Sequence, residues 1–129
     1  MIELNDVFAT LAEMTGTPLP PGGADDSMSF ARVLLDPKTE SPRRFAVHHS
    51  RTGVFALREG DWKFVPSRGS GGFSAPLTRA AKPGEPPGQL YNIATDPSET
   101  KNAWLEHPEI VARLSAKLSE LQTSSRTRP

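Results

Sequence analysis

A chain of 129 residues is long enough for one small domain, and its even balance of charge excludes the partners that strongly basic or acidic proteins attract. Fifteen basic and fifteen acidic residues give a formal net charge of zero, so no overall field favours nucleic acid or an anionic membrane. The hydrophobic content of 36%, with 13 Pro and 10 Gly, predicts a small core and long irregular connections. The absence of Cys excludes disulfides, a Cys-based zinc site and a thiol nucleophile.

The N-terminal part predicts two short helices. Asn5 or Asp6 is suited to cap the first, and Gly16 followed by Pro18 ends it. Its apolar residues recur at helical spacing and are Leu4, Val7, Phe8, Leu11 and Met14. A stripe this wide on so short a helix predicts packing against a bulky neighbour that the chain does not supply. A further helical segment is expected within residues 27–35, where the candidates for burial are Met28, Phe30, Val33 and Leu34.

A small sheet is predicted next. Strands are expected at residues 44–49, 52–58 and 61–65, with Glu59-Gly60 as the tight turn between the last two. The matching apolar residues of this hairpin, which predict the core, are Phe55, Leu57, Trp62 and Phe64. Residues 66–87 are rich in Pro and Gly and read as a long irregular loop, after which residues 89–92 return as a short fourth strand.

The last predicted element is an amphipathic helix. Pro108 suits its first turn and Glu109 suits the positive end of its dipole. Its apolar stripe consists of Ile110, Val111, Leu114, Leu118 and Leu121. The fold class expected is therefore α+β: a small four-stranded antiparallel sheet with the C-terminal amphipathic helix packed on one face, preceded by a short N-terminal helix. Residues 123–129 are polar and predict a disordered tail.

Four segments of the chain, in order, resemble the C-terminal part of the sulfatase family. Residues 88–102 (GQLYNIATDPSETKN), running into the HPE of residues 107–109, resemble the closing pattern of that family. The segments that agree further are residues 6–16 (DVFATLAEMTG), 25–30 (DDSMSF) and 53–63 (GVFALREGDWK). The resemblance implies three parts: residues 1–36 join a catalytic domain, residues 37–122 form the C-terminal subdomain, and residues 123–129 are a tail.

Sulfatases cleave sulfate esters with a formylglycine made from Cys or Ser in a C/S-x-P-x-R motif, beside a calcium ion held by Asp and Asn. Residues 64–68 (FVPSR) mimic the end of that motif, but Phe64 stands at the nucleophile position and cannot become an aldehyde of that kind. The resemblance therefore implies a chain that is inactive alone and holds no cofactor itself, whereas the parent family uses calcium and formylglycine.

Four side chains are candidates for contact with a substrate: His48, His49, Arg51 and Arg58. His48 and His49 are adjacent on a predicted strand, so they point to opposite faces and cannot both hold one metal ion. The arginines suit an anionic ligand through charge-assisted bonds, although hairpin cations are more often solvated. A merely structural or exposed role is the competing interpretation for each.

Two hypotheses of function follow, and a third is kept open. The first is a noncatalytic C-terminal fragment of a sulfatase that buttresses the catalytic domain, in cis or in trans, and lines a pocket for a sulfated small molecule or saccharide. The second is an independent module that binds anions or a protein, and the third is a two-chain enzyme. Neither nucleic acid nor membrane is an expected partner. The compartment stays open: the parent family is often periplasmic or secreted, and the start at Met1 shows no basic and apolar leader.

Overall fold

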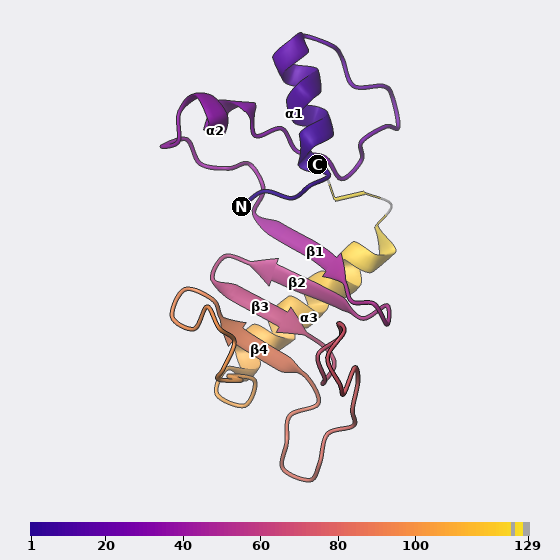
Figure 1. Cartoon of the computed structure of the whole chain (residues 1–129), viewed down its shortest axis with the longest axis vertical. Coiled ribbons are helices and arrows are strands. Elements are labelled where there is room, and N and C mark those ends of the chain that lie inside the picture. Colours follow the sequence, from indigo (N-terminus) through magenta and orange to yellow (C-terminus); the bar gives the residue numbers. More distant parts are fainter. Residues whose placement is uncertain (125, 128–129) are drawn as a thin grey trace. The chain divides into compact units, whose positions relative to one another are not determined.

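The computed structural model describes residues 1–124 and 126–127, and its elements follow the predicted order (Figure 1). They are α1 (Asp6–Thr15), α2 (Ala31–Leu35), β1 (Phe45–His49), β2 (Phe55–Glu59), β3 (Trp62–Val65), β4 (Gln89–Asn92) and α3 (Pro108–Thr123). The chain divides into two compact units, one of residues 1–46 with 121–129 and one of residues 47–120. No helix in the described ranges combines the length and the apolar character needed to cross a bilayer.

The four strands form one antiparallel sheet in the order β1-β2-β3-β4 (Figure 1). Leu57 of β2 lies opposite Phe64 of β3, which in turn lies opposite Leu90 of β4. Gly60 takes a φ of 57° in the two-residue connection between β2 and β3, a conformation that glycine adopts without steric cost. The predicted fold class, α+β with a four-stranded antiparallel sheet, is confirmed.

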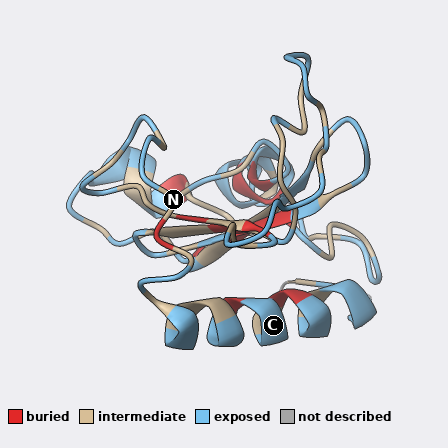
Figure 2. Ribbon diagram, turned by 90° about the horizontal axis from the view of Figure 1, so that it is seen from below, coloured by how far each residue is buried: buried red, intermediate tan, exposed pale blue. Residues whose placement is uncertain are grey.

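The core of the second unit lies between the sheet and α3. Leu57, Phe64 and Leu90 are at most 1% exposed, and the buried side of α3, with Leu114 and Leu118, faces them (Figure 2). The ring of Trp104 stacks on that of Phe64 with centroids 5.4 Å apart and so adds to this core. At about 25 cal/mol per Å² of apolar surface, such side chains each contribute about 1.5–3 kcal/mol.

The first unit is organised by a buried ion pair. Asp6 and Arg43 are 1% and 4% exposed, and the guanidinium donates from Nε and Nη2 to the two carboxylate oxygens at 2.7 and 2.5 Å. Burial by itself would raise the pKa of Asp6, but hydrogen bonds from Arg43 and from the amides of Met28 and Glu3 outweigh it and hold that pKa below its usual value.

One expectation for the first unit needs correction. The helix expected within residues 27–35 is present and spans Ala31–Leu35, but Leu34, a candidate for burial, is 58% exposed. Helix α1 turns Asp6, Ala9 and Thr10 inward and leaves its apolar stripe exposed. Thr10 and Ser27 satisfy the buried polar groups, since Thr10 donates to the carbonyl of Asp6 and Ser27 accepts from the amide of Ala9. The predicted disordered tail falls partly on residues 125 and 128–129, which lie outside the described residues.

Candidate functional site

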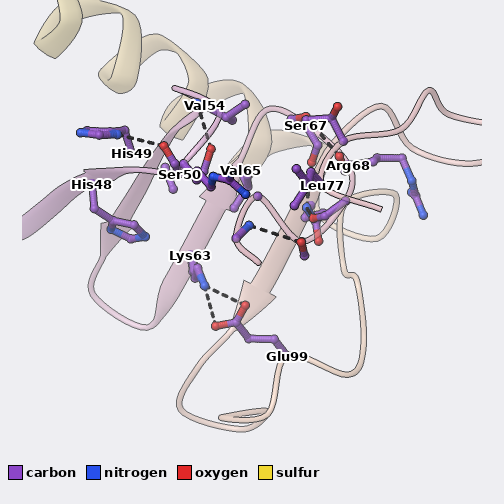
Figure 3. Close-up of a pocket in the computed structure, with 18 of the residues that line it drawn as sticks. His48, His49, Ser50, Val54, Lys63, Val65, Ser67, Arg68, Leu77 and Glu99 are labelled. Carbon is purple, nitrogen blue, oxygen red and sulfur yellow. Dashed lines mark hydrogen bonds and ion pairs between the residues drawn. The ribbon is translucent and has the colours of Figure 1, made fainter. Parts of the chain in front are cut away.

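A cavity of about 530 Å³ lies on the face of the sheet that α3 does not cover (Figure 3). Side chains alternate along a strand, so the neighbours of Leu57, Phe64 and Leu90 in sequence point away from α3. Lys63, Val65 and Tyr91 are such neighbours, and they line the floor of the cavity. The turn after β1 and the loop after β3 supply its walls.

Positive charge prevails among the lining residues that the structure describes. Three carry a fixed positive charge, Arg51, Lys63 and Arg68, whereas Glu99 is their one carboxylate. Nζ of Lys63 donates to both oxygens of Glu99, at 2.6 and 2.8 Å (Figure 3). Glu99 has a φ of 55°, a left-handed conformation that is uncommon for a residue with a side chain. Arg68 in turn lies 3.6 Å from a carboxylate oxygen of Glu85, so Arg51 is the one cation of the described lining that has no carboxylate partner and is available to a negatively charged ligand.

His48 faces the Lys63 side of the cavity, as strand alternation predicts. The pKa of His48 is lowered, chiefly by burial and further by the positive charge of Lys63, whereas the carboxylate of Glu99 raises it. The ring of His49 instead meets the ring of Phe55 edge to face, with centroids 6.0 Å apart, and its Nδ1 lies 2.9 Å from the carbonyl oxygen of Ser50. A neutral His48 is suited to hydrogen bonding with a ligand rather than to charge pairing.

The other two candidate residues fare differently. Arg51 lies at the tip of the turn after β1, and its guanidinium carbon is 5.6 Å from the centroid of the Phe73 ring. Arg58 is exposed on β2 opposite Lys63, and the described lining of the cavity does not include it. His48, His49 and Arg51 are thus brought together, and Arg58 is not.

Two residues of the site were not singled out from the sequence. Phe73 is 91% exposed, and Arg68 is held by the carbonyl of Pro86 at 2.9 Å, while its buried Nε has no hydrogen-bond partner. The only signal for Phe73 was an aromatic residue inside a Gly- and Ser-rich segment, a composition that reads as an irregular loop.

The residues present do not fit a calcium or formylglycine centre. Calcium takes six to eight oxygen ligands, with carboxylates among them, and in the part of the chain that the structure describes no group of three or more Asp, Glu, His or Cys residues could hold a metal ion. The chain contains no Cys, and Phe64, at the position that corresponds to the nucleophile, is 1% exposed in the core.

Comparison with known proteins gives a consistent set of relatives. No family model matches the chain. It is 33% identical over 123 residues to the N-acetylgalactosamine-6-O-sulfatase of Bacteroides thetaiotaomicron, a match that covers 92% of this chain and 23% of that protein. It is 24% identical over 133 residues to arylsulfatase K of Mus musculus, covering 94% of this chain and 21% of the relative.

A solved structure agrees with these relatives. This structure, described in connection with the metabolism of multiple glycosaminoglycans by Bacteroides thetaiotaomicron, superposes on the chain with a TM-score of 0.73 at 32% identity. The superposition covers 92% of this chain and 24% of that one. The chain therefore spans between a fifth and a quarter of the length of the relatives it matches.

Proposed function

Since this chain is related to the sulfatases and corresponds to a C-terminal fragment of one, we propose that it is a noncatalytic subdomain that buttresses a sulfatase catalytic domain and lends its cavity to the substrate pocket. The catalytic domain is supplied in cis, by the same polypeptide, or in trans, by another. The parent reaction is the hydrolysis of a sulfuric ester, and its calcium and formylglycine belong to that catalytic domain.

The observation that carries this proposal is the apolar face of α1, a surface formed by five residues on and just before the helix. Their exposed fractions are 89% for Leu4, 39% for Val7, 54% for Phe8, 55% for Leu11 and 61% for Met14. Soluble monomers rarely expose a contiguous apolar patch of this kind unless a partner covers it. One side of α1 already packs against the first unit, and its exposed apolar side is suited to packing against a second partner.

The same observation separates the proposal from an independent binding module. A module that functions by itself would bury its amphipathic helix against its own core, whereas α1 buries Asp6, Ala9 and Thr10. Leu35 of the neighbouring α2 adds to the exposed apolar surface at 86%. The exposed residues favour a large apolar partner, and in the sulfatases the missing three quarters of the relatives' length would supply it.

A chimera tests the proposal. The part of the Bacteroides thetaiotaomicron sulfatase that this chain matches is replaced by the 129 residues, and release of sulfate from N-acetylgalactosamine 6-sulfate is measured. We expect a soluble, active chimera, and we expect the double variant Phe8→Asp with Leu11→Asp to lose both properties. The isolated chain with the same substitutions should keep its fold, because both side chains are exposed in it.

Leu105→Asp is the matched control, since Leu105 is equally apolar and 66% exposed but lies outside the apolar face of α1. Its chimera should retain activity. An active chimera that tolerates the α1 double variant would show that the face is not a docking surface, and hydrolysis by the isolated chain, with or without calcium, would contradict a noncatalytic role.

A further inference from the structure

The loop after β3 is fixed onto the turn after β1 by backbone hydrogen bonds. The amide of Arg51 donates to the carbonyl of Gly71 at 3.0 Å, and the amide of Gly71 donates to the carbonyl of Leu77 at 2.8 Å. Gly69 has a φ of 104°, and a Cβ there would lie 2.5 Å from the carbonyl oxygen of Leu77. The loop is therefore closely packed at its base, and the position of its tip follows from these bonds.

This fixed loop presents an aromatic ring to solvent. Phe73 is 91% exposed, so its ring contributes almost nothing to the stability of the described chain. It is also isolated, because no other large hydrophobic residue of the loop is among the exposed ones of the described chain. A protein partner favours a contiguous patch such as the apolar face of α1, whereas a single exposed ring beside polar groups suits a smaller ligand.

The neighbouring cation is free to bind that ligand. The guanidinium of Arg51 has no carboxylate partner in the described part of the chain, and its central carbon lies over the ring of Phe73, 5.6 Å from the centroid. His48, Ser50 and Lys63 line the same cavity and supply further polar groups. A planar guanidinium binds carboxylate, sulfate or phosphate oxygens through paired hydrogen bonds.

We propose that Phe73 and Arg51 form a subsite for an anionic sugar, in which the ring of Phe73 stacks on the C–H face of a pyranose and Arg51 binds the sulfate or carboxylate of that sugar. The inference deepens the proposed function and rests on it for the sulfated substrate class. A pyranose has one apolar face of C–H groups and a polar rim, which matches a flat ring with a cation at its edge. Both residues line the cavity of about 530 Å³, which is large enough for a further part of the saccharide.

NMR titration of the 129-residue chain tests the subsite directly. The probes are N-acetylgalactosamine 6-sulfate, N-acetylgalactosamine and inorganic sulfate. We expect the sulfated sugar to shift the ring resonances of Phe73 and the Nε resonance of Arg51. Phe73→Ala should weaken its binding about three- to tenfold and leave the affinity for inorganic sulfate unchanged, since one aromatic stacking contact is worth that much. Phe73→Trp should restore binding.

Substitutions of arginine distinguish binding of the anionic group from binding of the sugar ring. Arg51→Gln should weaken both the sulfated sugar and inorganic sulfate, whereas Arg58→Gln, a control cation outside the cavity lining, should weaken neither. Equal loss of both ligands in Phe73→Ala, or unshifted Phe73 resonances at every concentration reached, would overturn the subsite. A third result would also overturn the subsite: the chimera with Phe73→Ala fails to assemble, whereas the isolated chain with Phe73→Ala binds the sugar normally. The ring of Phe73 would then contact the catalytic domain and not the sugar. The two proposals can fail separately. If the isolated chain binds the sulfated sugar but the chimera tolerates the Phe8→Asp and Leu11→Asp variants, only the proposal that α1 docks on the catalytic domain is refuted.

Discussion

Removing the carboxylate of Asp6 should destabilise the first unit far more than any surface substitution. The Arg43 guanidinium, at 2% side-chain exposure, donates twice to Asp6 and once each to the carbonyls of Asp26 and Phe45, at 2.6 and 3.3 Å. Breaking a buried pair by removing one partner costs about 3–5 kcal/mol, because the remaining charge stays buried. Glu3 still contacts Arg43 at 2.7 Å in Asp6→Asn, so the loss should lie near the lower end, about 3 kcal/mol.

Hydrogen exchange of the α1 amides measures this loss. Tryptophan fluorescence would not, because Trp62 and Trp104 both lie in the second unit and report on the sheet. A change of about 3 kcal/mol corresponds to a protection factor reduced roughly a hundredfold. Glu13→Gln is the control, because its 4.0 Å contact with Arg32 is exposed and contributes about 0–1 kcal/mol. A loss below about 0.5 kcal/mol in Asp6→Asn would refute the buried pair as the element that holds this unit together.

The same pair predicts how stability depends on pH. Hydrogen bonds from Arg43, Met28 and Glu3 keep the folded pKa of Asp6 below 3.8 despite the opposing effect of burial. The unfolded chain therefore binds its proton first, so the contribution of Asp6 is complete above pH 3.8 and is lost as the pH falls through the lower, folded pKa. The protection factors of the α1 amides, which are corrected for the intrinsic exchange rate at each pH, should fall in that acidic window in the unmodified chain, and this acid dependence should be absent from Asp6→Asn.

Two further predictions concern the cavity and its loop. Glu99→Gln should lower the pKa of His48 further in an NMR titration of its ring, because the carboxylate that raises this pKa is lost while Lys63 stays charged; an increase would contradict the electrostatic assignment. Gly69→Ala should destabilise the loop by about 1–3 kcal/mol, measured by amide exchange of residues 69–78, because φ is positive and the added Cβ meets the Leu77 carbonyl. Gly72→Ala is its matched control, since the nearest atom lies 3.8 Å away, and equal effects of the two would refute the steric argument.

Short-range patterns predicted the sheet and the last helix well. Alternation placed Leu57 and Phe64 in the core correctly, and the helical stripe placed Leu114 and Leu118 there too. Phe55 was expected in the same core but is 40% exposed, and its ring meets that of His49 instead. The expected start of β2 at residue 52 was three residues early, because the amide of Ser50 bonds the carbonyl of Val54 and closes a turn. The resemblance to the sulfatases, read from four short segments, is confirmed by relatives that match over most of the chain.

Long-range partners account for what the sequence did not predict. The inward face of α1 depends on Arg43, which lies 37 residues from Asp6, and no local pattern marks those two side chains as a pair. The position of Phe73 depends in the same way on hydrogen bonds between two loops that are separate in the sequence. Composition indicated an irregular loop correctly, but the contacts that hold such a loop in place are set by tertiary structure.

The chain presents two surfaces with opposite chemistry, and this contrast argues for two kinds of occupant. The apolar face of α1 lacks the charged groups that would bind a sulfated ligand, and its free energy of association would come from burial of apolar area. Among its described lining, the cavity carries one cation without a carboxylate partner, Arg51, and one isolated ring, so burying it under a protein would leave Arg51 desolvated without a counter-charge, which costs several kcal/mol. A protein partner on α1 would bury its apolar side chains, and an anionic sugar at the cavity would pair with Arg51. With the two occupants exchanged, the apolar face would stay exposed and Arg51 would be desolvated without a counter-charge.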